Sequence, residues 1–194
     1  MDAPLPIGIQ LDERAVRVLA HPLRSRILGE LRMHGPATAT ELAATLTTNT
    51  GATSYHLRAL EGVGLVTDTG DGAGRRRLWR ASSDYHSWTN SAFAGDEDTQ
   101  TALGWLRREY IRQFAQRAER WLDAESAWPA EWVDVFGLDD SLLTLTSAQL
   151  AELRSELAAL VQKCRQAGEG DPAARRVHFA WQSMPVELDP PPAP

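Results

Sequence analysis

The stretch TATELAATLTTNTGATSYHLRAL, residues 38–60, decides the fold of the first half of the chain. Thr38 and Glu41 have the spacing of a capping box, which predicts that a helix begins here. After a polar link at residues 47–49, a second helix is expected from about Thr50 to the glycines near residue 62. Two short helices joined by such a link form a helix-turn-helix.

The residues on either side of this stretch extend the motif. Upstream, we expect a short helix over 12–20 and a second one that opens with Pro22 in its first turn and stops at Gly35. Downstream, strands are expected over 65–67 and 77–80. The intervening residues are rich in Gly and Asp, which tolerate the positive φ of a hairpin tip. A hairpin after a recognition helix is a wing, so the sequence predicts a winged helix-turn-helix.

Three runs of sequence resemble the ArsR/SmtB family of bacterial transcriptional regulators. They are LAHPLRSRIL at 19–28, TELA at 40–43, and TSYHLRAL at 53–60 followed by GLV at 64–66. The resemblance covers about residues 11–90, less than half of the chain. It implies a homodimeric regulator, usually a repressor, that binds a palindromic operator and is released by an effector.

The period of the expected helix at 50–63 separates its two faces. Leu57 and Leu60, with Ala52 or Thr53 one turn earlier, are expected to pack on the preceding helices. The opposite face would enter the major groove. His56 borders the buried face, and this position fits a packing role and a phosphate contact equally well. The candidate DNA-contacting residues of this helix are Thr50, Ser54, Tyr55, His56 and Arg58.

Arginines 75–77 lie at the tip of the expected wing (65–80), where they would follow the DNA backbone or enter the minor groove. Neutralisation of phosphates supplies most of the sequence-independent affinity for DNA. Because side chains alternate along a strand, only some of the three would face DNA. We take Arg75 and Arg76 as the preferred pair and keep Arg77 as a further candidate.

The distribution of charge agrees with DNA binding, although the net charge of −6 alone would argue against it. Residues 17–80 carry nine Arg and five acidic residues, a balance of +4, whereas residues 81–194 carry ten basic and eighteen acidic residues, a balance of −8. Such asymmetry favours a basic working module joined to an acidic one. No apolar run approaches the roughly 20 residues of a membrane span. A cytoplasmic location is expected.

The sequence lacks the patterns of metal sensing and of catalysis. The stretch 38–44 has no Cys-x-Cys pair, and Asp84 and His86 lack the second pair of ligands, because Glu97 and Gln100 stand where it would fall. Cys164, on the apolar side of an expected helix, suits a buried structural thiol better than a redox sensor. No phosphate loop, HExxH or nucleophile-elbow motif is present. We expect no metal, no cofactor and no enzymatic activity.

The second half predicts a long helix over about 96–124, suited to a dimer interface, although a helix within the core of one chain is the alternative. A strand at 142–145, a helix opened by Thr146 and Gln149, and a strand at 177–181 would form a small strand-helix-strand unit. Five of the seven tryptophans lie in this half, as core filling or as the lining of an effector pocket. A Pro-rich tail at 189–194 should be disordered.

The predicted fold class is therefore mainly α with small β elements: a winged helix-turn-helix domain (1–92), a helical dimerisation and possible effector domain (93–188), and the tail. The predicted function is that of a homodimeric repressor that binds double-stranded operator DNA. Two alternatives stay open. One is a winged-helix protein-interaction module, because fold does not imply function. The other is a regulator that responds to an apolar or aromatic small molecule.

Overall fold

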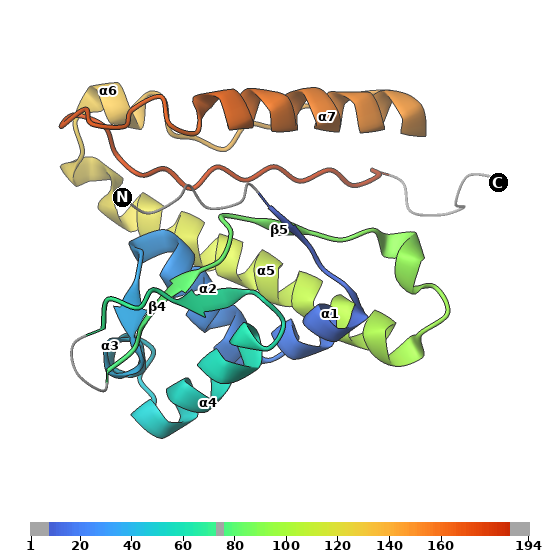
Figure 1. Cartoon of the computed structure of the whole chain (residues 1–194). Helices are drawn as coiled ribbons and strands as arrows, with labels where there is room; N and C mark the ends of the chain where they lie inside the picture. The colour runs from blue at the N-terminus through green and yellow to red at the C-terminus, as the bar shows by residue number, and fades with distance from the viewer. Residues whose placement is uncertain (1–7, 73–75, 187–194) are drawn as a thin grey trace. The chain divides into compact units, whose positions relative to one another are not determined.

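The computed structural model describes residues 8–72 and 76–186, which fall into two compact units divided between Val133 and Asp134 (Figure 1). The chain is mainly helical with small sheets, as the sequence predicts. The first unit contains all of the described strands. The domain boundary expected at residue 92 falls inside this unit. Arg75 and the tail at 189–194 lie outside the described residues.

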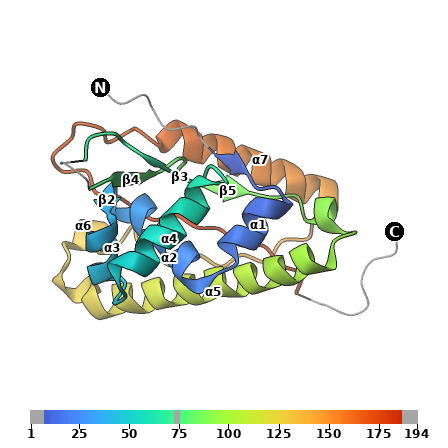
Figure 2. The same cartoon turned by 60° about the horizontal axis from the view of Figure 1, so that its bottom comes forward.

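The four helices expected in the first half are all present. They are α1 (Glu13–Leu19), α2 (Pro22–His34), α3 (Ala39–Thr45) and α4 (Thr50–Glu61). The capping box is confirmed, since the Thr38 hydroxyl accepts a hydrogen bond from the Glu41 N–H while the Glu41 carboxylate accepts from the Thr38 N–H. Thr47, in the turn between α3 and α4, has a φ of 53°. The α3–turn–α4 pair is the predicted helix-turn-helix (Figure 2).

A three-stranded antiparallel sheet follows the helix-turn-helix. Its strands are β2 (Ala37–Thr38), β3 (Val66–Asp68) and β4 (Leu78–Ala81), in the order β2-β4-β3. Val66 pairs with Ala81 and Asp68 with Trp79, which sets the register of the predicted hairpin. A second small sheet pairs β1 (Ile9–Gln10) with β5 (His86–Ser87) in parallel. The sequence analysis did not predict β1, β2 or β5.

The long helix α5 (Glu97–Ala124) begins after the 3-10 helix η1 (Asn90–Phe93), and Asp96 is its N-cap. Its first part packs against α1, as both views of the ribbon show (Figures 1 and 2). Leu103 and Leu106 are buried in the common core, whereas no described residue of α5 beyond Leu106 is fully buried. The unit ends with η2 (Glu125–Ala127) and α6 (Ala130–Val133).

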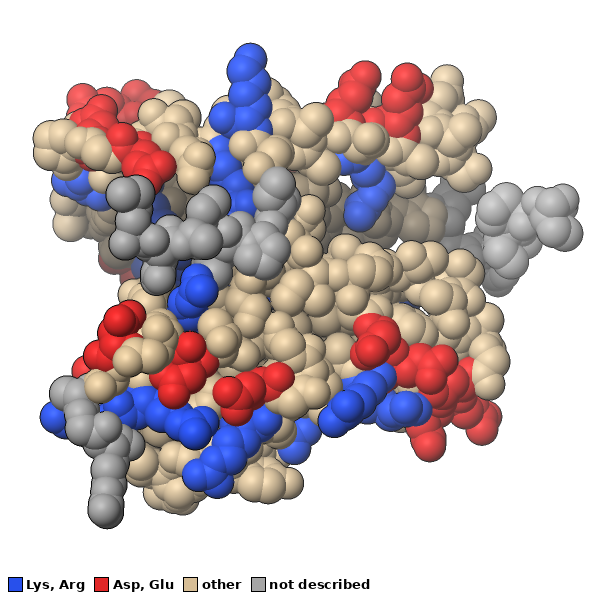
Figure 3. Space-filling view, in the orientation of Figure 1, with Lys and Arg blue, Asp and Glu red and all other residues tan. Residues whose placement is uncertain are grey.

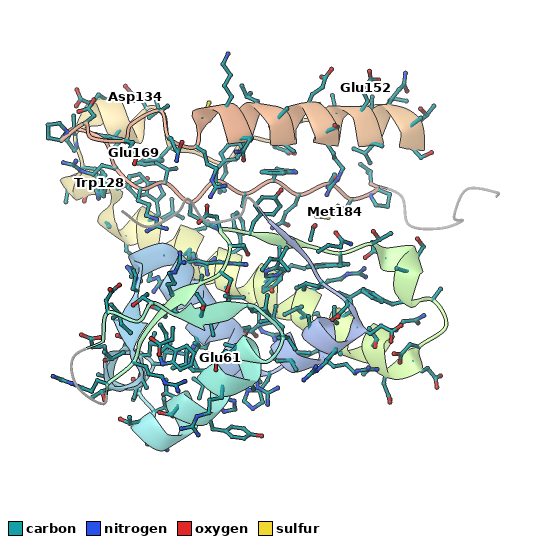
Figure 4. The ribbon with its side chains drawn as sticks, viewed as in Figure 1. Glu61, Trp128, Asp134, Glu152, Glu169 and Met184 are labelled. Atoms are coloured by element: carbon teal, nitrogen blue, oxygen red, sulfur yellow. The ribbon has the colours of Figure 1, made fainter. Side chains whose placement is uncertain are left out.

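The second unit consists of α7 (Ser147–Cys164) and extended segments on either side of it. The predicted capping box of Thr146 and Gln149 is confirmed. The segment after the helix returns along it, and Arg154 donates a hydrogen bond to the Ser183 hydroxyl at 3.4 Å. Figure 4 shows Glu152 on the side of α7 that faces away from the returning segment, which carries Met184.

The predicted strand-helix-strand arrangement is wrong, since residues 142–145 and 177–181 form no strand. A strand requires a partner for its backbone and a surface against which one face is buried. Neither segment has such a surface: the side chain of Leu142, for example, is 82% exposed. The expectation that Cys164 is buried is also wrong, because the thiol is exposed and no described residue of α7 is fully buried.

No helix in the described part of the chain is long and apolar enough to cross a membrane.

Candidate nucleic-acid interface

The exposed face of α4 carries most of the residues that the sequence analysis selected. Thr50, Tyr55 and Arg58 are exposed and Ser54 is half-buried, whereas Thr53, Leu57 and Leu60 are buried. The division between the two faces is therefore the one that the helical period predicts. Tyr55 is 61% exposed, which is unusual for a large aromatic side chain in the centre of a helix.

The start of α4 is fixed by polar contacts on the side of the turn. Asn49 is the N-cap, and its side-chain oxygen accepts a hydrogen bond from the Ala52 N–H at 2.8 Å. The hydroxyl of Thr53 donates to the Asn49 carbonyl at 3.1 Å. These bonds hold the first turn of α4 while its outward-facing side chains remain accessible. A recognition helix presents this end to base edges in the major groove.

His56 is buried between α4 and the start of α2. Its Nδ1 accepts a hydrogen bond from Arg24 Nε at 3.2 Å, and its ring lies 4.4 Å from that of His21. Burial lowers the pKa of His56, and the neighbouring His21 and Arg24 lower it further. The ring therefore contributes to helix packing. Whether it also contacts DNA phosphate stays a prediction.

The arginines of the wing have different surroundings. Arg76 is exposed and lies close enough to Glu41 of α3 to help lower the pKa of that carboxyl, after the stronger effect of the hydrogen bonds from Thr38. Arg77 forms an ion pair with Asp68 at 3.4 Å and lies over the ring of Trp79 at 5.7 Å. The guanidinium of Arg77 is thus held by contacts within the hairpin, whereas that of Arg76 is more accessible to a backbone phosphate.

Basic side chains gather in a band along the lower part of the face seen in Figure 3, where the ribbon of Figure 1 has α3, α4 and α1. Acidic side chains border this band. The band agrees with the positive balance of residues 17–80 in the sequence. Its position on the helix-turn-helix is the one that electrostatic attraction of DNA requires.

The Asp84-x-His86 pattern leads to a buried polar network. His86 Nδ1 accepts a hydrogen bond from Arg32 Nη1 at 2.6 Å, so the neutral ring carries its proton on Nε2, which lies 2.7 Å from the Tyr110 hydroxyl. Burial, followed by repulsion from Arg32, lowers the pKa of His86 to about 3. Both ring nitrogens thus have protein partners. Among the described residues, no group of three or more His, Cys, Asp or Glu side chains is arranged to hold a metal ion.

The tryptophans at the end of α5 and after it make local contacts with one another. Trp128, in the loop after η2, packs edge-to-face against Trp121 at 5.5 Å and against Trp132 of α6 at 6.2 Å. Trp105, near the start of α5, packs instead on the core. The structure therefore gives Trp105 a packing role. An effector-binding role for the other four tryptophans of the second half, Trp121, Trp128, Trp132 and Trp181, stays a prediction.

His21 and Arg24 belong to this region but were not selected by sequence reasoning. Both lie at the start of α2, within the run HPLR that forms part of the family resemblance. Nothing in the local pattern of α2 indicates that its first turn packs against the middle of α4. That information is contained only in the tertiary contact between His21 and His56.

Comparison with known proteins supports the helix-turn-helix. Residues 19–69, from the last residue of α1 into the wing, match the family described as a helix-turn-helix domain. This match covers about a quarter of the chain and supports a DNA-binding transcription regulator of the helix-turn-helix class. A search of the curated proteins finds no match.

Proposed function

We propose that this protein is a homodimeric transcriptional repressor that binds a palindromic DNA operator. In this proposal, the recognition helix (50–63) enters the major groove, where Thr50, Ser54 and Tyr55 read base edges. The wing (65–80) contacts the phosphate backbone through Arg75 and Arg76. The observation that carries the proposal is the accessible polar face of α4, framed by a capped N-terminus and a β-hairpin.

The part of α5 beyond Leu106 supports the dimer. This helix has 28 residues, yet its fully buried residues all lie in its first part. Further along, Ile111 and Leu122 are each 56% exposed. Apolar side chains along one helix are better buried against a second copy than left in water. A dimer of this kind would carry two recognition helices, which would suit an operator with two symmetric half-sites.

Enrichment of genomic DNA fragments by the purified full-length chain tests DNA recognition. We expect enrichment of a short fragment with two similar half-sites about one helical turn apart. A reporter gene placed behind this fragment should be less active when the protein is present. If no fragment is enriched over random DNA, the alternative of a protein-interaction module is favoured.

Light scattering tests the dimer separately. The wild-type chain should have twice the mass of one chain, and Leu122→Glu should shift it toward the monomer. The exposed polar residue Glu119 of the same helix offers a matched control, since Glu119→Ala should leave the mass unchanged. A wild-type monomer at all concentrations would contradict the dimer while leaving DNA binding open to its own test.

A further inference from the structure

Three nitrogen-bearing side chains form a compact cluster where the start of α2 meets α4. His21 is the N-cap of α2, Arg24 lies in its first turn, and His56 comes from the middle of α4. The two imidazole rings are 4.4 Å apart, and Arg24 bridges to His56 through its Nε. His21 and Arg24 are half-buried, so the cluster reaches the surface.

The hydrogen bonds within the cluster fix where the ring protons lie. His21 Nδ1 accepts from the Leu23 N–H at 3.2 Å, and His56 Nδ1 accepts from Arg24 Nε. In a neutral imidazole one nitrogen accepts and the other donates, so both rings carry their proton on Nε2. Burial lowers the pKa of both histidines, which keeps the rings neutral near pH 7.

The remaining donors of the cluster have no partner in the part of the chain that the structure describes. Neither Nε2–H makes a hydrogen bond there, and Arg24, which uses Nη1 to bond the Val18 carbonyl, leaves Nη2 without one. Among the described residues, Arg80 Nε is the one side-chain nitrogen or oxygen that is buried and makes no hydrogen bond. His56 Nε2 makes no hydrogen bond either, so it is not buried and is reached by solvent. The cluster therefore presents three donors and a positive charge.

Among the residues that the structure describes, no acidic side chain forms an ion pair with Arg24. Among the described residues, the ion pairs of arginines with carboxylates involve Arg17, Arg77 and Arg112, but not Arg24. The groups that shift the pKa values of the two histidines include no carboxylate either. Donors without acceptors, around an uncompensated guanidinium, have the chemistry of an anion site.

The location of the cluster identifies the anion. The ring of Tyr55, on the exposed face of α4, lies 5.2 Å from that of His56, so the cluster borders the face proposed to read DNA. The opposite end of α2 meets the root of the wing, where Arg32 donates to the Ser83 carbonyl at 2.9 Å. At 1.5 Å per residue, Arg24 and Arg32 are about 12 Å apart along the helix. The major groove is also about 12 Å wide, and a helix that lies in it has a phosphate backbone on either side. The spacing between the two ends of α2 is therefore comparable to the distance between the two backbones.

We propose that His21, Arg24 and His56 form a binding site for a DNA backbone phosphate on the flank of α4, away from the wing. This inference rests on the proposed DNA-binding function. The Arg24 guanidinium supplies the charge, and the two Nε2–H groups supply directed hydrogen bonds. The wing and this site would contact the phosphate backbones of the two DNA strands that border the groove. These contacts would fix the position of α4 between the two backbones.

The test measures binding of the full-length chain to a 30-base-pair duplex of mixed sequence and to an enriched genomic duplex, by fluorescence anisotropy over a series of salt concentrations. Arg24→Gln should weaken binding to both duplexes by about tenfold and reduce the salt slope by about 1, the signature of one lost phosphate contact. Arg24→Lys should restore the slope but only part of the affinity, because it keeps the charge and loses the planar fork of donors.

Arg26→Gln is the matched control. Arg26 is an exposed arginine of the same helix, and it acts electrostatically on Glu109 of α5. It should change affinity and salt slope much less. His21→Asn retains an N-cap side chain and removes the Nε2 donor, so it should weaken binding by about threefold on both duplexes. Thermal unfolding of each variant checks the fold.

Nitrogen NMR of the imidazoles gives a readout that does not depend on mutation. In the wild-type chain, the Nε2 signals of His21 and His56 should shift when the mixed-sequence duplex is added, while that of the exposed His34 should not. The inference is overturned if Arg24→Gln behaves like Arg26→Gln, or if neither Nε2 signal moves while DNA binds. If the wild-type chain binds no duplex at all, the proposed function itself fails and the inference fails with it.

Discussion

Ser54 and Tyr55 should read sequence, whereas Arg76 should only neutralise charge. Ser54→Ala or Tyr55→Ala is expected to lower affinity for the enriched duplex more than for mixed-sequence DNA, by about 1–3 kcal/mol where a base contact is lost. Arg76→Ala should weaken both equally and reduce the salt slope by about 1. Anisotropy titrations on both duplexes measure the difference.

Tyr55→Phe is the control for packing, because the Tyr55 ring contacts that of His56. It keeps the ring contact and removes only the hydroxyl. Arg75 is expected to behave as Arg76 does, because the two form the preferred pair of phosphate contacts at the wing tip. If Arg76→Ala changes sequence preference while Ser54→Ala and Tyr55→Ala have no effect, base reading belongs to the wing and the assignment of the faces of α4 fails.

At the scale of single residues, the sequence predicted what depends on the helix alone. The burial of Leu57 and Leu60 follows from the 3.6-residue period and needs no knowledge of the rest of the fold. The surroundings of His56 could not be predicted in the same way. Its 9% exposure results from His21 and Arg24, which the chain brings together across a sequence separation of more than 30 residues.

His86 should make stability depend on pH. Its pKa is about 3 in the folded chain and near 6.5 when unfolded, so between these values the unfolded state binds the additional proton. Stability should therefore fall as pH decreases from 6.5, with a contribution of at most about 1.4 kcal/mol per pH unit. His86→Gln removes this contribution while keeping an acceptor for Arg32 and a donor for Tyr110.

Urea unfolding of the wild type and His86→Gln at pH 7.0, 5.5 and 4.5 checks this expectation. Carboxylates with lowered pKa values, such as Asp96 and Glu109, also destabilise the fold on acidification, but they are common to both chains. The difference between the two curves therefore isolates His86. Parallel curves would mean that His86 is protonated as readily in the folded state as in the unfolded state.

At the scale of elements, helices were predictable and the strands of the second half were not. Both capping boxes mark helix starts through contacts between residues three apart. A strand depends on a partner elsewhere in the chain. The hairpin β3–β4 has its partner close in sequence and was predicted, whereas β2 pairs with the distant β4 and was missed. Residues 142–145 and 177–181 have the composition expected of strands, but neither pairs with a strand among the residues that the structure describes.

The two capping boxes allow a paired test of how the units contribute to stability. Thr38→Ala removes the side-chain cap of α3, which carries the buried Leu42 and Ala43, and should lower the free energy of unfolding by about 1 kcal/mol. Thr146→Ala makes the same change in α7, which has no fully buried residue in the described chain, and should leave the main transition unaltered. Urea denaturation followed by circular dichroism measures both. Equal losses would indicate that the two units unfold together.

At the scale of the whole molecule, the buried core belongs to the first unit. Every fully buried apolar residue that the structure describes lies between Leu11 and Leu106, contributed by α1 to α5, the wing strands and the connections between them. The second unit contributes exposed apolar side chains instead, among them Val135, Leu142 and Val186. Hydrophobic burial is the dominant favourable term in folding, so the first unit should hold its structure by itself.

A chain that ends at Val133 tests this expectation. Its thermal midpoint should lie within about 3 °C of the main transition of the full chain, which corresponds to a change of less than about 1 kcal/mol. Its far-ultraviolet circular dichroism should lose the contribution of α7, and its affinity for mixed-sequence DNA should remain, because α4 and the wing are intact. A matched truncation at Glu109 removes most of α5 beyond the buried Leu106, together with the hydroxyl partner of His86, and should lower the midpoint much further. If the chain that ends at Val133 is unfolded or aggregates, the second unit covers apolar surface on which the first depends, and the winged helix-turn-helix is not an independent folding unit.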